Sequence, residues 1–381
     1  MRIFKLFLIL AFLFVSKSLL AAEAQESPIS WQPMSDKIFE QAAKENKLVI
    51  MDLEAVWCHW CHVMADTTYQ NPKVAELIRS KFIPLRVDQD ANPDISIRYE
   101  DWGWPATVIF APNGSEIVKR RGYIPPEAMV SLLEAVIQDP TPGPSVEVEN
   151  AIKPSEQAFL NSEQVKKLEE EHLSFYDKEN GGWGNRLKLI DPNQLEWAII
   201  KARNGDPIEE SMARKTLDQA LNLLDPVWGG FYQYSDEKNW KSPHYEKIMS
   251  VQSSYMKLYA LAYAAWKKQK YLDAAEKVAG YVAEFWTDAG GAFYTSQDAD
   301  VDQEMKGKEF YAKNNADRRA LGKMPKIDRH IYSRENGWMI SALCSLYDVT
   351  GNERYLDSAK RSAEWILKNR NLSGDGFRHD A

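Results

Sequence analysis

The chain has 381 residues and 44% hydrophobic content, which is enough to form more than one hydrophobic core, so two domains are expected. Its formal charge of −8 gives no basis for binding nucleic acid or an anionic membrane surface. Three cysteines are too few for a disulfide-stabilised scaffold, although one close pair can form a redox couple.

Residues 1–24 have the features of a secretory signal peptide. Arg2 and Lys5 precede an apolar run over residues 6–15, and Ala22-Glu23-Ala24 supplies small residues for a cleavage site. The apolar run is short for a membrane span, and a retained membrane anchor is the alternative interpretation. We expect a periplasmic or secreted protein without stable membrane insertion after signal removal.

Short helical and apolar segments alternate through residues 27–138. Their periodicities predict a mixed α/β domain that closes with a helix. The expected helices cover residues 35–46, 63–81 with a break near 71–72, 93–100 and 126–137, and the expected strands cover 48–54, 82–87, 106–110 and 116–122.

Two of the three cysteines, Cys58 and Cys61, lie where the first expected strand is followed by a helix. Cys58 therefore falls at a helix N-terminus, where free amide groups and the helix dipole favour a thiolate. Cys61 lies one turn further on and faces the same side, so it can attack a mixed disulfide formed at Cys58. We predict that Cys58 is the nucleophile and Cys61 the resolving thiol.

Other interpretations of this motif stay open. Cys58-His59-Trp60-Cys61-His62 also matches the haem c attachment pattern, which would consume both thiols. Cys58, Cys61 and His62 could instead begin a zinc site, but no fourth ligand is evident nearby. The redox interpretation needs no cofactor and no metal. In it, His59 stabilises the Cys58 thiolate, and His62 does the same or faces solvent.

The order of elements around the motif resembles the thioredoxin fold. Trp57 precedes the first cysteine as in thioredoxins, and Trp60 can shield the pair or form a docking surface. Pro105, which follows Trp104, stands where thioredoxins carry a cis-proline facing the disulfide. Asp52 matches the buried acid that takes the proton of the resolving cysteine, since burial raises a carboxyl pKa. A strand-edge proline and a solvent-facing aspartate are the alternatives.

A proline-rich segment, residues 139–144, breaks regular structure and opens a predicted linker over residues 139–156. Residues 157–381 are then helical in composition, with no convincing strand. Cys344 falls in one apolar helix, where a buried, inert thiol is expected. Helices are expected at 157–172, 192–203, 208–224, 247–268, 271–286, 334–349 and 353–370.

A glycine-rich loop follows alternate helices of this second region, which is typical of stacked helical hairpins. By the same rule the last loop should lead into an eighth helix, which the sequence does not contain. We therefore expect an open ring or a shortened version of a longer protein. The loops are Gly181-Gly182-Trp183-Gly184, Gly229-Gly230-Phe231-Tyr232, Gly290-Gly291-Ala292-Phe293-Tyr294 and Gly374-Asp375-Gly376-Phe377.

These loops and their neighbours resemble the spermatogenesis-associated protein 20-like family. In that family a thioredoxin-like domain with Cys-His-Trp-Cys-His precedes a six-hairpin, glycosidase-like α/α toroid. The resemblance implies an α/β thioredoxin-like N-terminal domain and an all-α helical-hairpin domain, a partial α/α toroid of about four hairpins. Asp52 is closer to ordinary thioredoxins than to this family. The matching motifs are Trp228-Gly229-Gly230-Phe231, Tyr234-Ser235, Trp240, Pro243-His244-Tyr245-Glu246-Lys247, Phe293-Tyr294 and Asp298-Ala299-Asp300.

The toroid resemblance also implies a ligand pocket in the helical half. His244, Glu246, Asp298 and Asp300 lie in or beside loops that would share one mouth, and paired carboxylates about 5 to 10 Å apart can cleave glycosides. The alternative is that Glu246 caps a helix and the two aspartates shape a turn. The candidates for stacking on sugar rings are Trp183, Trp228 and Trp240.

Two functions therefore compete. The first is an exported thiol-disulfide oxidoreductase that acts on protein thiols or disulfides. The second is a carbohydrate-binding or carbohydrate-active protein in which the thioredoxin-like domain is accessory.

Overall fold

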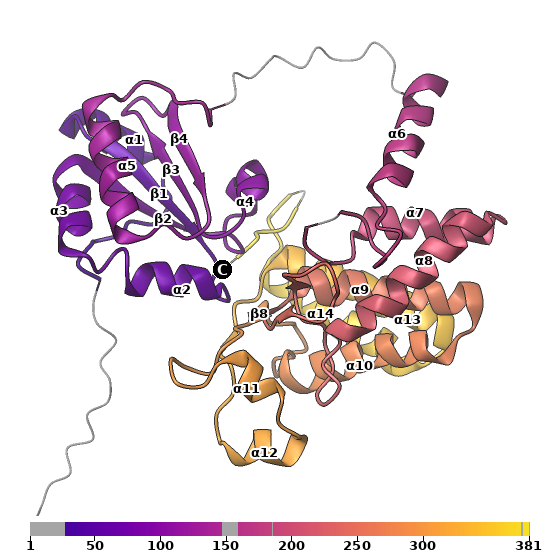
Figure 1. Cartoon of the computed structure of the whole chain (residues 1–381). Coiled ribbons are helices and arrows are strands. Elements are labelled where there is room, and N and C mark those ends of the chain that lie inside the picture. Colours follow the sequence, from indigo (N-terminus) through magenta and orange to yellow (C-terminus); the bar gives the residue numbers. More distant parts are fainter. Residues whose placement is uncertain (1–26, 147–158, 185, 375, 381) are drawn as a thin grey trace, which may run out of the picture.

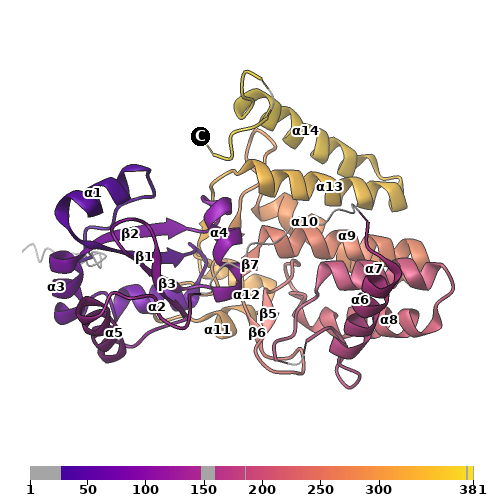
Figure 2. The ribbon, with the colours of Figure 1, turned by 90° about the horizontal axis from the view of Figure 1, so that it is seen from above.

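The computed structural model describes residues 27–146, 159–184, 186–374 and 376–380. The predicted signal peptide and residues 147–156 of the predicted linker lie outside these ranges. Within them the chain forms an α/β domain and a helical domain that lie side by side (Figure 1). The view from above shows the sheet of the first domain beside the helices of the second (Figure 2).

The first domain is built on one four-stranded sheet with the strand order β2-β1-β3-β4. The central strand β1 (Leu48–Glu54) pairs in parallel with β2 (Phe82–Asp88) and antiparallel with β3 (Ala106–Phe110). The edge strand β4 (Glu116–Arg121) is antiparallel to β3. All four strands were predicted, because each is a short apolar run between turn residues.

Helices cover both faces of this sheet and form two separate hydrophobic cores. On β1, Ile50 faces α2, α3 and α5, whereas Val49 and Met51 face α1 and α4, since successive side chains of a strand alternate. This three-layer order is the one expected for a thioredoxin-like domain. The helices are α1 (Lys37–Glu45), α2 (His59–Asp66), α3 (Pro72–Lys81), α4 (Pro93–Tyr99), the 3₁₀ helix η1 (Glu100–Trp102) and α5 (Pro126–Gln138).

The second domain consists of helical hairpins packed around α9. Helices α7 and α8, α9 and α10, and α13 and α14 form antiparallel pairs, and α9 also contacts α7 and α13. The helices are α6 (Ser162–Phe175), α7 (Pro192–Arg203), α8 (Pro207–Ala220), the 3₁₀ helix η2 (Leu221–Leu223), α9 (Met249–Trp266), α10 (Gln269–Phe285), α11 (Gly307–Tyr311), α12 (Asn315–Ala320), α13 (Ser333–Thr350) and α14 (Glu353–Asn369).

The four glycine-rich loops share one local structure, as the repeat predicts. An isolated antiparallel bridge closes each loop. Gly229 requires glycine, because its φ is +78° and a Cβ would lie 2.3 Å from the Lys277 carbonyl oxygen. The bridges pair Tyr176 with Trp183, Leu224 with Phe231, Thr287 with Phe293 and Asn371 with Phe377.

A buried ionic cluster fixes the second of these loops. Asp225, at the start of the loop, accepts hydrogen bonds from Lys247 at 3.0 Å and from both terminal nitrogens of Arg318 at 2.8 and 3.1 Å. All three side chains are fully buried. Burial lowers the pKa of Lys247 to about 8, although Asp225 opposes this change. A single carboxylate therefore holds two buried cations, so its removal would leave both without their partner.

Three expectations about the helical half were wrong. The expectation of no strands fails because five two-residue strands occur, and a run this short has no periodicity to detect. Helices α11 and α12 were missed for the same reason, since they span one to two turns. Helix α6 begins at Ser162, where Asn161 caps it, and not near residue 157. The strands are β5 (Tyr234–Ser235), β6 (Pro243–His244), β7 (Lys247–Ile248), β8 (Ser296–Gln297) and β9 (Ile327–Asp328).

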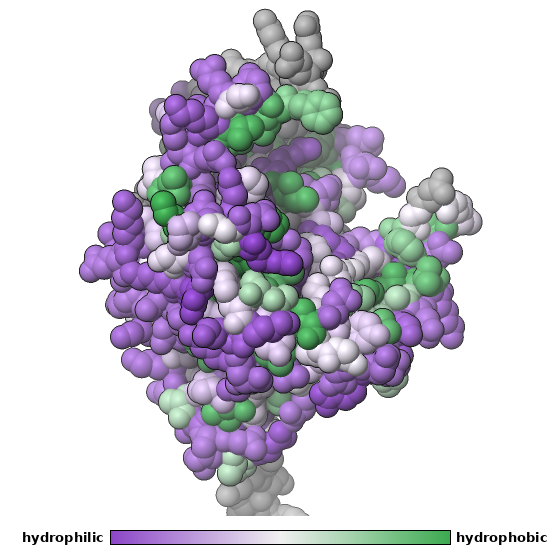
Figure 3. Space-filling model, turned by 90° about the vertical axis from the view of Figure 1, so that its right-hand side faces the viewer, coloured by the Kyte–Doolittle hydropathy of each residue, from purple (hydrophilic) through white to green (hydrophobic). Residues whose placement is uncertain are grey.

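The face of the molecule drawn in Figure 3 is mainly polar. Figure 3 shows small hydrophobic groups scattered over an otherwise hydrophilic face. Among the helices that the structure describes, none combines the length and hydrophobicity needed to cross a membrane.

Candidate functional site

The two cysteines lie at the start of α2, directly after β1. Cys58 is the N-cap residue of α2, and its Sγ accepts a hydrogen bond from the Cys61 backbone amide at 3.1 Å. The two residues form a disulfide. An amide that donates to Sγ in the disulfide is also placed to stabilise a thiolate after reduction. The predicted helix N-terminal position of Cys58 is therefore present, with α2 starting at His59 and not at residue 63.

The loop before β3 lies against the disulfide. Trp104 packs on a cluster formed by Trp57, Cys58 and Cys61, and the Trp104–Pro105 peptide bond is cis. The pairing of Ala106 with Leu53 brings this loop to the end of β1 from which the cysteine segment leaves. The structure therefore brings together the predicted proline loop and the predicted redox pair.

Asp52 is buried in the sheet, but it has a charged partner that the sequence analysis did not identify. Arg86, on the neighbouring strand β2, donates a hydrogen bond from Nε to one Asp52 oxygen at 3.1 Å, and a terminal nitrogen of its guanidinium lies 3.0 Å from the same oxygen. Burial raises the pKa of Asp52, and the guanidinium of Arg86 opposes this change. The solvent-facing alternative is excluded, since the side chain is 4% exposed.

The helical domain covers this site directly. Ile248, on β7, packs against the cluster that contains both cysteines. The His59 Nδ1 lies 3.0 Å from an Asp300 carboxylate oxygen, and the His62 Nδ1 lies 3.4 Å from Asp298. Both cysteines are consequently buried, with exposed fractions of 4% for Cys58 and 3% for Cys61.

Asp300 is held in place on its own domain. The Gly307 amide donates to one carboxylate oxygen at 2.7 Å, and Lys306 lies 3.1 Å from the other. Burial favours the neutral acid, but His59, Gly307 and Lys306 outweigh it and lower the pKa of Asp300 to about 2. In turn, the hydrogen bond to Asp300 raises the pKa of His59, and the nearby charge of Glu246 adds to this effect.

Two further contacts join the domains near the site. Gln303 donates to Asp66, on α2, at 3.3 Å. His379 lies 2.7 Å from the Asp90 carbonyl oxygen, and the Asp90 side chain accepts a hydrogen bond from the Trp57 indole at 2.8 Å. These partners are 237 and 289 residues apart in sequence, and no local pattern could have indicated them.

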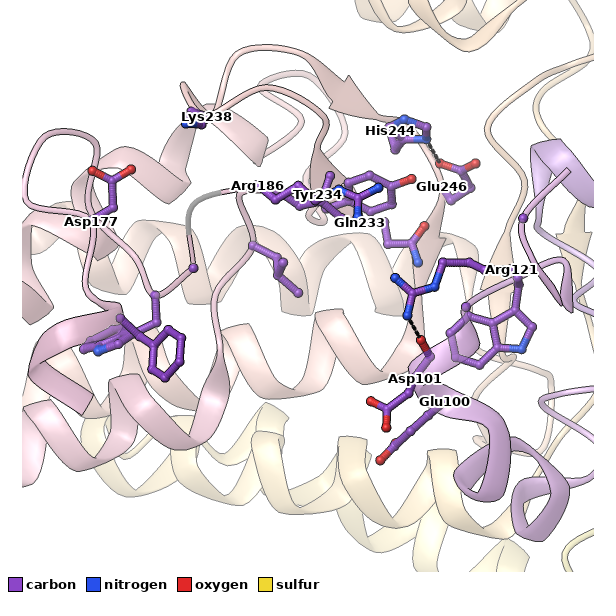
Figure 4. A pocket seen from close by; sticks show the side chains of 18 of the residues that line it. Glu100, Asp101, Arg121, Asp177, Arg186, Gln233, Tyr234, Lys238, His244 and Glu246 are labelled. Carbon is purple, nitrogen blue, oxygen red and sulfur yellow. Dashed lines mark hydrogen bonds and ion pairs between the residues drawn. The ribbon is translucent and has the colours of Figure 1, made fainter. Parts of the chain in front are cut away.

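A cleft of about 950 Å³ lies between the domains and includes Cys58 in its wall. The thioredoxin-like domain contributes Trp57, His59, Trp60, the segment before Pro105 and Arg121. The helical domain contributes Trp183 and, among the residues labelled in Figure 4, Asp177, Arg186, Gln233, Tyr234, Lys238, His244 and Glu246. Trp60 is 45% exposed and packs near Tyr123, so it forms part of the accessible rim.

His244 and Glu246 lie next to each other in the cleft (Figure 4). The His244 Nε2 is hydrogen-bonded to Asp236, and its Nδ1 lies 3.7 Å from the Glu246 Oε2, beyond hydrogen-bond distance. That oxygen is buried and has no hydrogen-bond partner among the described residues. Burial raises the pKa of Glu246, while His244 opposes this change.

Most of the other predicted pocket residues do not face the cleft. Trp240 is fully buried and donates its indole hydrogen bond to the Asn180 carbonyl, so it is a core residue. Trp228 packs on Phe285 and donates to Asn315. The expectation of sugar stacking by these two tryptophans is not supported, because a glycine-flanked tryptophan has the same sequence appearance in a core as in a pocket.

Asp298 and Asp300 were predicted to line a ligand pocket, but they contact His62 and His59 of the thioredoxin-like domain instead. No group of three or more histidine, cysteine, aspartate and glutamate side chains within the described ranges has an arrangement suited to a metal ion. Cys344 is only half-buried on α13, and not fully buried as expected.

Comparisons with known proteins agree with this two-part architecture. The family model described as "Thioredox_DsbH: Protein of unknown function, DUF255" matches residues 12–139. Human spermatogenesis-associated protein 20 is 26% identical over 72% of this chain and 39% of its own length. A thioredoxin of Mycoplasmoides gallisepticum is 33% identical over 25% of this chain and 90% of its own length.

Among solved structures, the cellobiose 2-epimerase of Spirochaeta thermophila is similar at 13% identity, covering 55% of this chain and 52% of its own, with a TM-score of 0.41. The chain spans about two fifths of the length of the curated relatives that it matches over most of its sequence. The cysteine motif, the domain order and these relatives agree with the resemblance to the spermatogenesis-associated protein 20-like family.

Proposed function

We propose that the protein is an exported thiol-disulfide oxidoreductase. The observation that carries the proposal is the position of Cys58, which caps α2, accepts the Cys61 amide and lies in the wall of the interdomain cleft. A sulfur at this position can ionise and meet a partner, while Cys61 lies behind it within α2.

Reduction of a substrate disulfide takes two thiol–disulfide exchange steps. The Cys58 thiolate attacks one sulfur of a substrate disulfide, and the other substrate sulfur leaves as a thiolate. Cys61 then loses its proton and attacks Cys58, which releases the second substrate sulfur and forms the protein disulfide. The substrate gains two electrons and two protons, and an external dithiol must reduce the protein again. The reverse sequence oxidises a substrate dithiol.

We assign the Cys61 proton to Asp52, whose buried carboxyl has a raised pKa. Arg86 fixes the orientation of this carboxylate and limits how far its pKa rises. Export is supported by the signal-like sequence of residues 1–24 and places the couple in an oxidising compartment.

The substrate reaches Cys58 through the cleft. On the other sides of the cysteine motif, Ile248 packs on both cysteines, and Asp298 and Asp300 contact His62 and His59. A flat protein surface of the usual 800 Å² or so per partner does not fit such an opening. An extended chain or a small disulfide does. A carbohydrate ligand of the cleft has less support, because only Trp183 of the three predicted tryptophans lines it.

Trapping of the mixed disulfide tests the proposal. The Cys61→Ser variant should accumulate mixed disulfides through Cys58, which appear as thiol-sensitive adducts in mass spectrometry. Cys58→Ser should trap none, and Cys344→Ser should behave like the parent protein. A folded Cys61→Ser protein that forms no adduct with any disulfide contradicts the proposal.

A further inference from the structure

Histidines and carboxylates are concentrated where the domains meet, and one buried carboxylate oxygen among them has no hydrogen-bond partner among the described residues, although His244 lies 3.7 Å from it. Each of three histidines lies within hydrogen-bond distance of its own carboxylate, or close to it. The pairs are His59 with Asp300 at 3.0 Å, His62 with Asp298 at 3.4 Å, and His244 with Asp236. Glu246 is the fourth carboxylate of the group, and its Oε2 accepts no hydrogen bond from any described residue.

Three separate observations indicate that Glu246 lies near the redox pair. It lines the same cleft as Cys58. Ile248, two residues further along the chain, packs on the cluster that holds both cysteines. The charge of Glu246 also acts on His59, the residue that follows Cys58. A ligand attached to Cys58 through sulfur therefore shares the cleft that Glu246 lines.

A buried carboxylate oxygen without a partner costs free energy, and this cost disappears when a bound molecule donates to it. The side chain of Glu246 is 4% exposed, so bulk water replaces that donor poorly. A hydroxyl group would supply a hydrogen bond but no charge. An ammonium group supplies the hydrogen bond and the opposite charge together.

We propose that the cleft is a binding site for a small disulfide or thiol that carries an ammonium group, with Glu246 as the acceptor of that group. This inference rests on the proposed function of Cys58 and Cys61 and specifies its substrate class. The cleft volume of about 950 Å³ lies within the range of small-molecule sites, roughly 300 to 1,000 Å³.

Three small disulfides of similar length separate the chemical features. Cystamine carries two ammonium groups, bis(2-hydroxyethyl) disulfide is neutral, and 3,3′-dithiodipropionate carries two carboxylates. Reduction of each by the full chain is followed as oxidation of the Cys58 and Cys61 dithiol in stopped-flow tryptophan fluorescence. Each rate constant is corrected for the intrinsic reactivity of the disulfide with a free thiol. We then expect the rate constant for cystamine to exceed that for the neutral disulfide by roughly tenfold or more, and dithiodipropionate should react most slowly.

The Glu246→Gln variant should abolish this preference for cystamine, because glutamine keeps the shape and loses the charge. Glu304→Gln makes the same charge change at an exposed position that does not line the cleft and should keep the preference. If Glu246→Gln does not fold, as judged by its circular dichroism, Glu246→Asp replaces it and should retain part of the preference.

The outcomes distinguish the two proposals. Absence of a preference for cystamine, or an equal loss in both glutamine variants, overturns the role of Glu246 while the redox function stands. A reduced parent protein that reacts with none of the three disulfides overturns the proposed redox function itself.

Discussion

Replacement of Asp300 with asparagine removes the carboxylate that the helical domain presents to His59, beside the predicted nucleophile. Two unit charges 3.0 Å apart attract each other by about 1.4 kcal/mol at the dielectric constant of water and about 5.5 kcal/mol at an effective dielectric constant of about 20. The side chains of His59 and Asp300 are 31% and 16% exposed, so solvent screens the pair and the lower figure is the better guide. We expect a coupling energy of about 1–2 kcal/mol.

A double-mutant cycle of His59→Ala and Asp300→Asn measures this coupling as a difference in free energy of unfolding. The hydrogen bond raises the pKa of His59 in the folded protein, so the contribution is complete below the unfolded value of about 6.5. It is lost as the pH rises through the folded value. The coupling should therefore be largest at about pH 6 and should decrease as the pH rises through the raised pKa of His59.

Asp302 provides the matched control, because it lies two residues further along the same loop and pairs with Lys323 of its own domain. Asp302→Asn should show no coupling with His59→Ala. A coupling near zero at pH 6, or an equal coupling for both aspartates, would refute the reasoning. The imidazole resonance of His59 in NMR gives a second readout, since Asp300→Asn should lower its pKa.

Three further predictions concern stability, and chemical denaturation measures each. Gly229→Ala should lower the free energy of unfolding by more than about 2 kcal/mol, because its Cβ meets the Lys277 carbonyl, whereas Gly205→Ala, with positive φ but open space, should cost about 1 kcal/mol. Asp225→Asn should cost about 3–5 kcal/mol, since two buried cations lose their carboxylate; a loss below about 1 kcal/mol would contradict this. Burial raises the pKa of Glu54 to about 7, so the folded protein binds a proton that the unfolded chain releases near pH 4.5; stability should fall between these values, and Glu54→Gln should flatten that fall.

Local features of the thioredoxin-like domain could be predicted because they have local causes. The strand-to-helix position of Cys58 follows from an apolar run and a change of periodicity. The break between α2 and α3 follows from Asn71-Pro72, where Asn71 accepts amide hydrogen bonds as a helix cap and proline occupies the first helical turn. The position of Pro105 before β3 was likewise visible in the order of elements.

The partners across the domain interface could not be predicted. Asp298 and Asp300 were recognised as unusual, but sequence gives no information on which residues they face, and a pocket was the simpler interpretation. Arg86 was missed although strand pairing places it opposite Asp52, because the register of β2 against β1 is not fixed by hydrophobic pattern alone. Glu246 was identified as a candidate, yet the role proposed for it depends on a carboxylate oxygen that accepts no hydrogen bond within the part of the chain that the structure describes.

The covering of the disulfide by distant residues has a consequence for the order in which the chain folds. The sheet and both cysteines emerge first, whereas Ile248 and Asp300 follow about 190 and 240 residues later. A nascent chain that has folded only its first domain presents the sulfurs without their cover. On the proposed function, selectivity for a narrow class of partner would depend on folding of the second domain, and a free-standing copy of the first domain should react with bulkier disulfides than the full chain accepts.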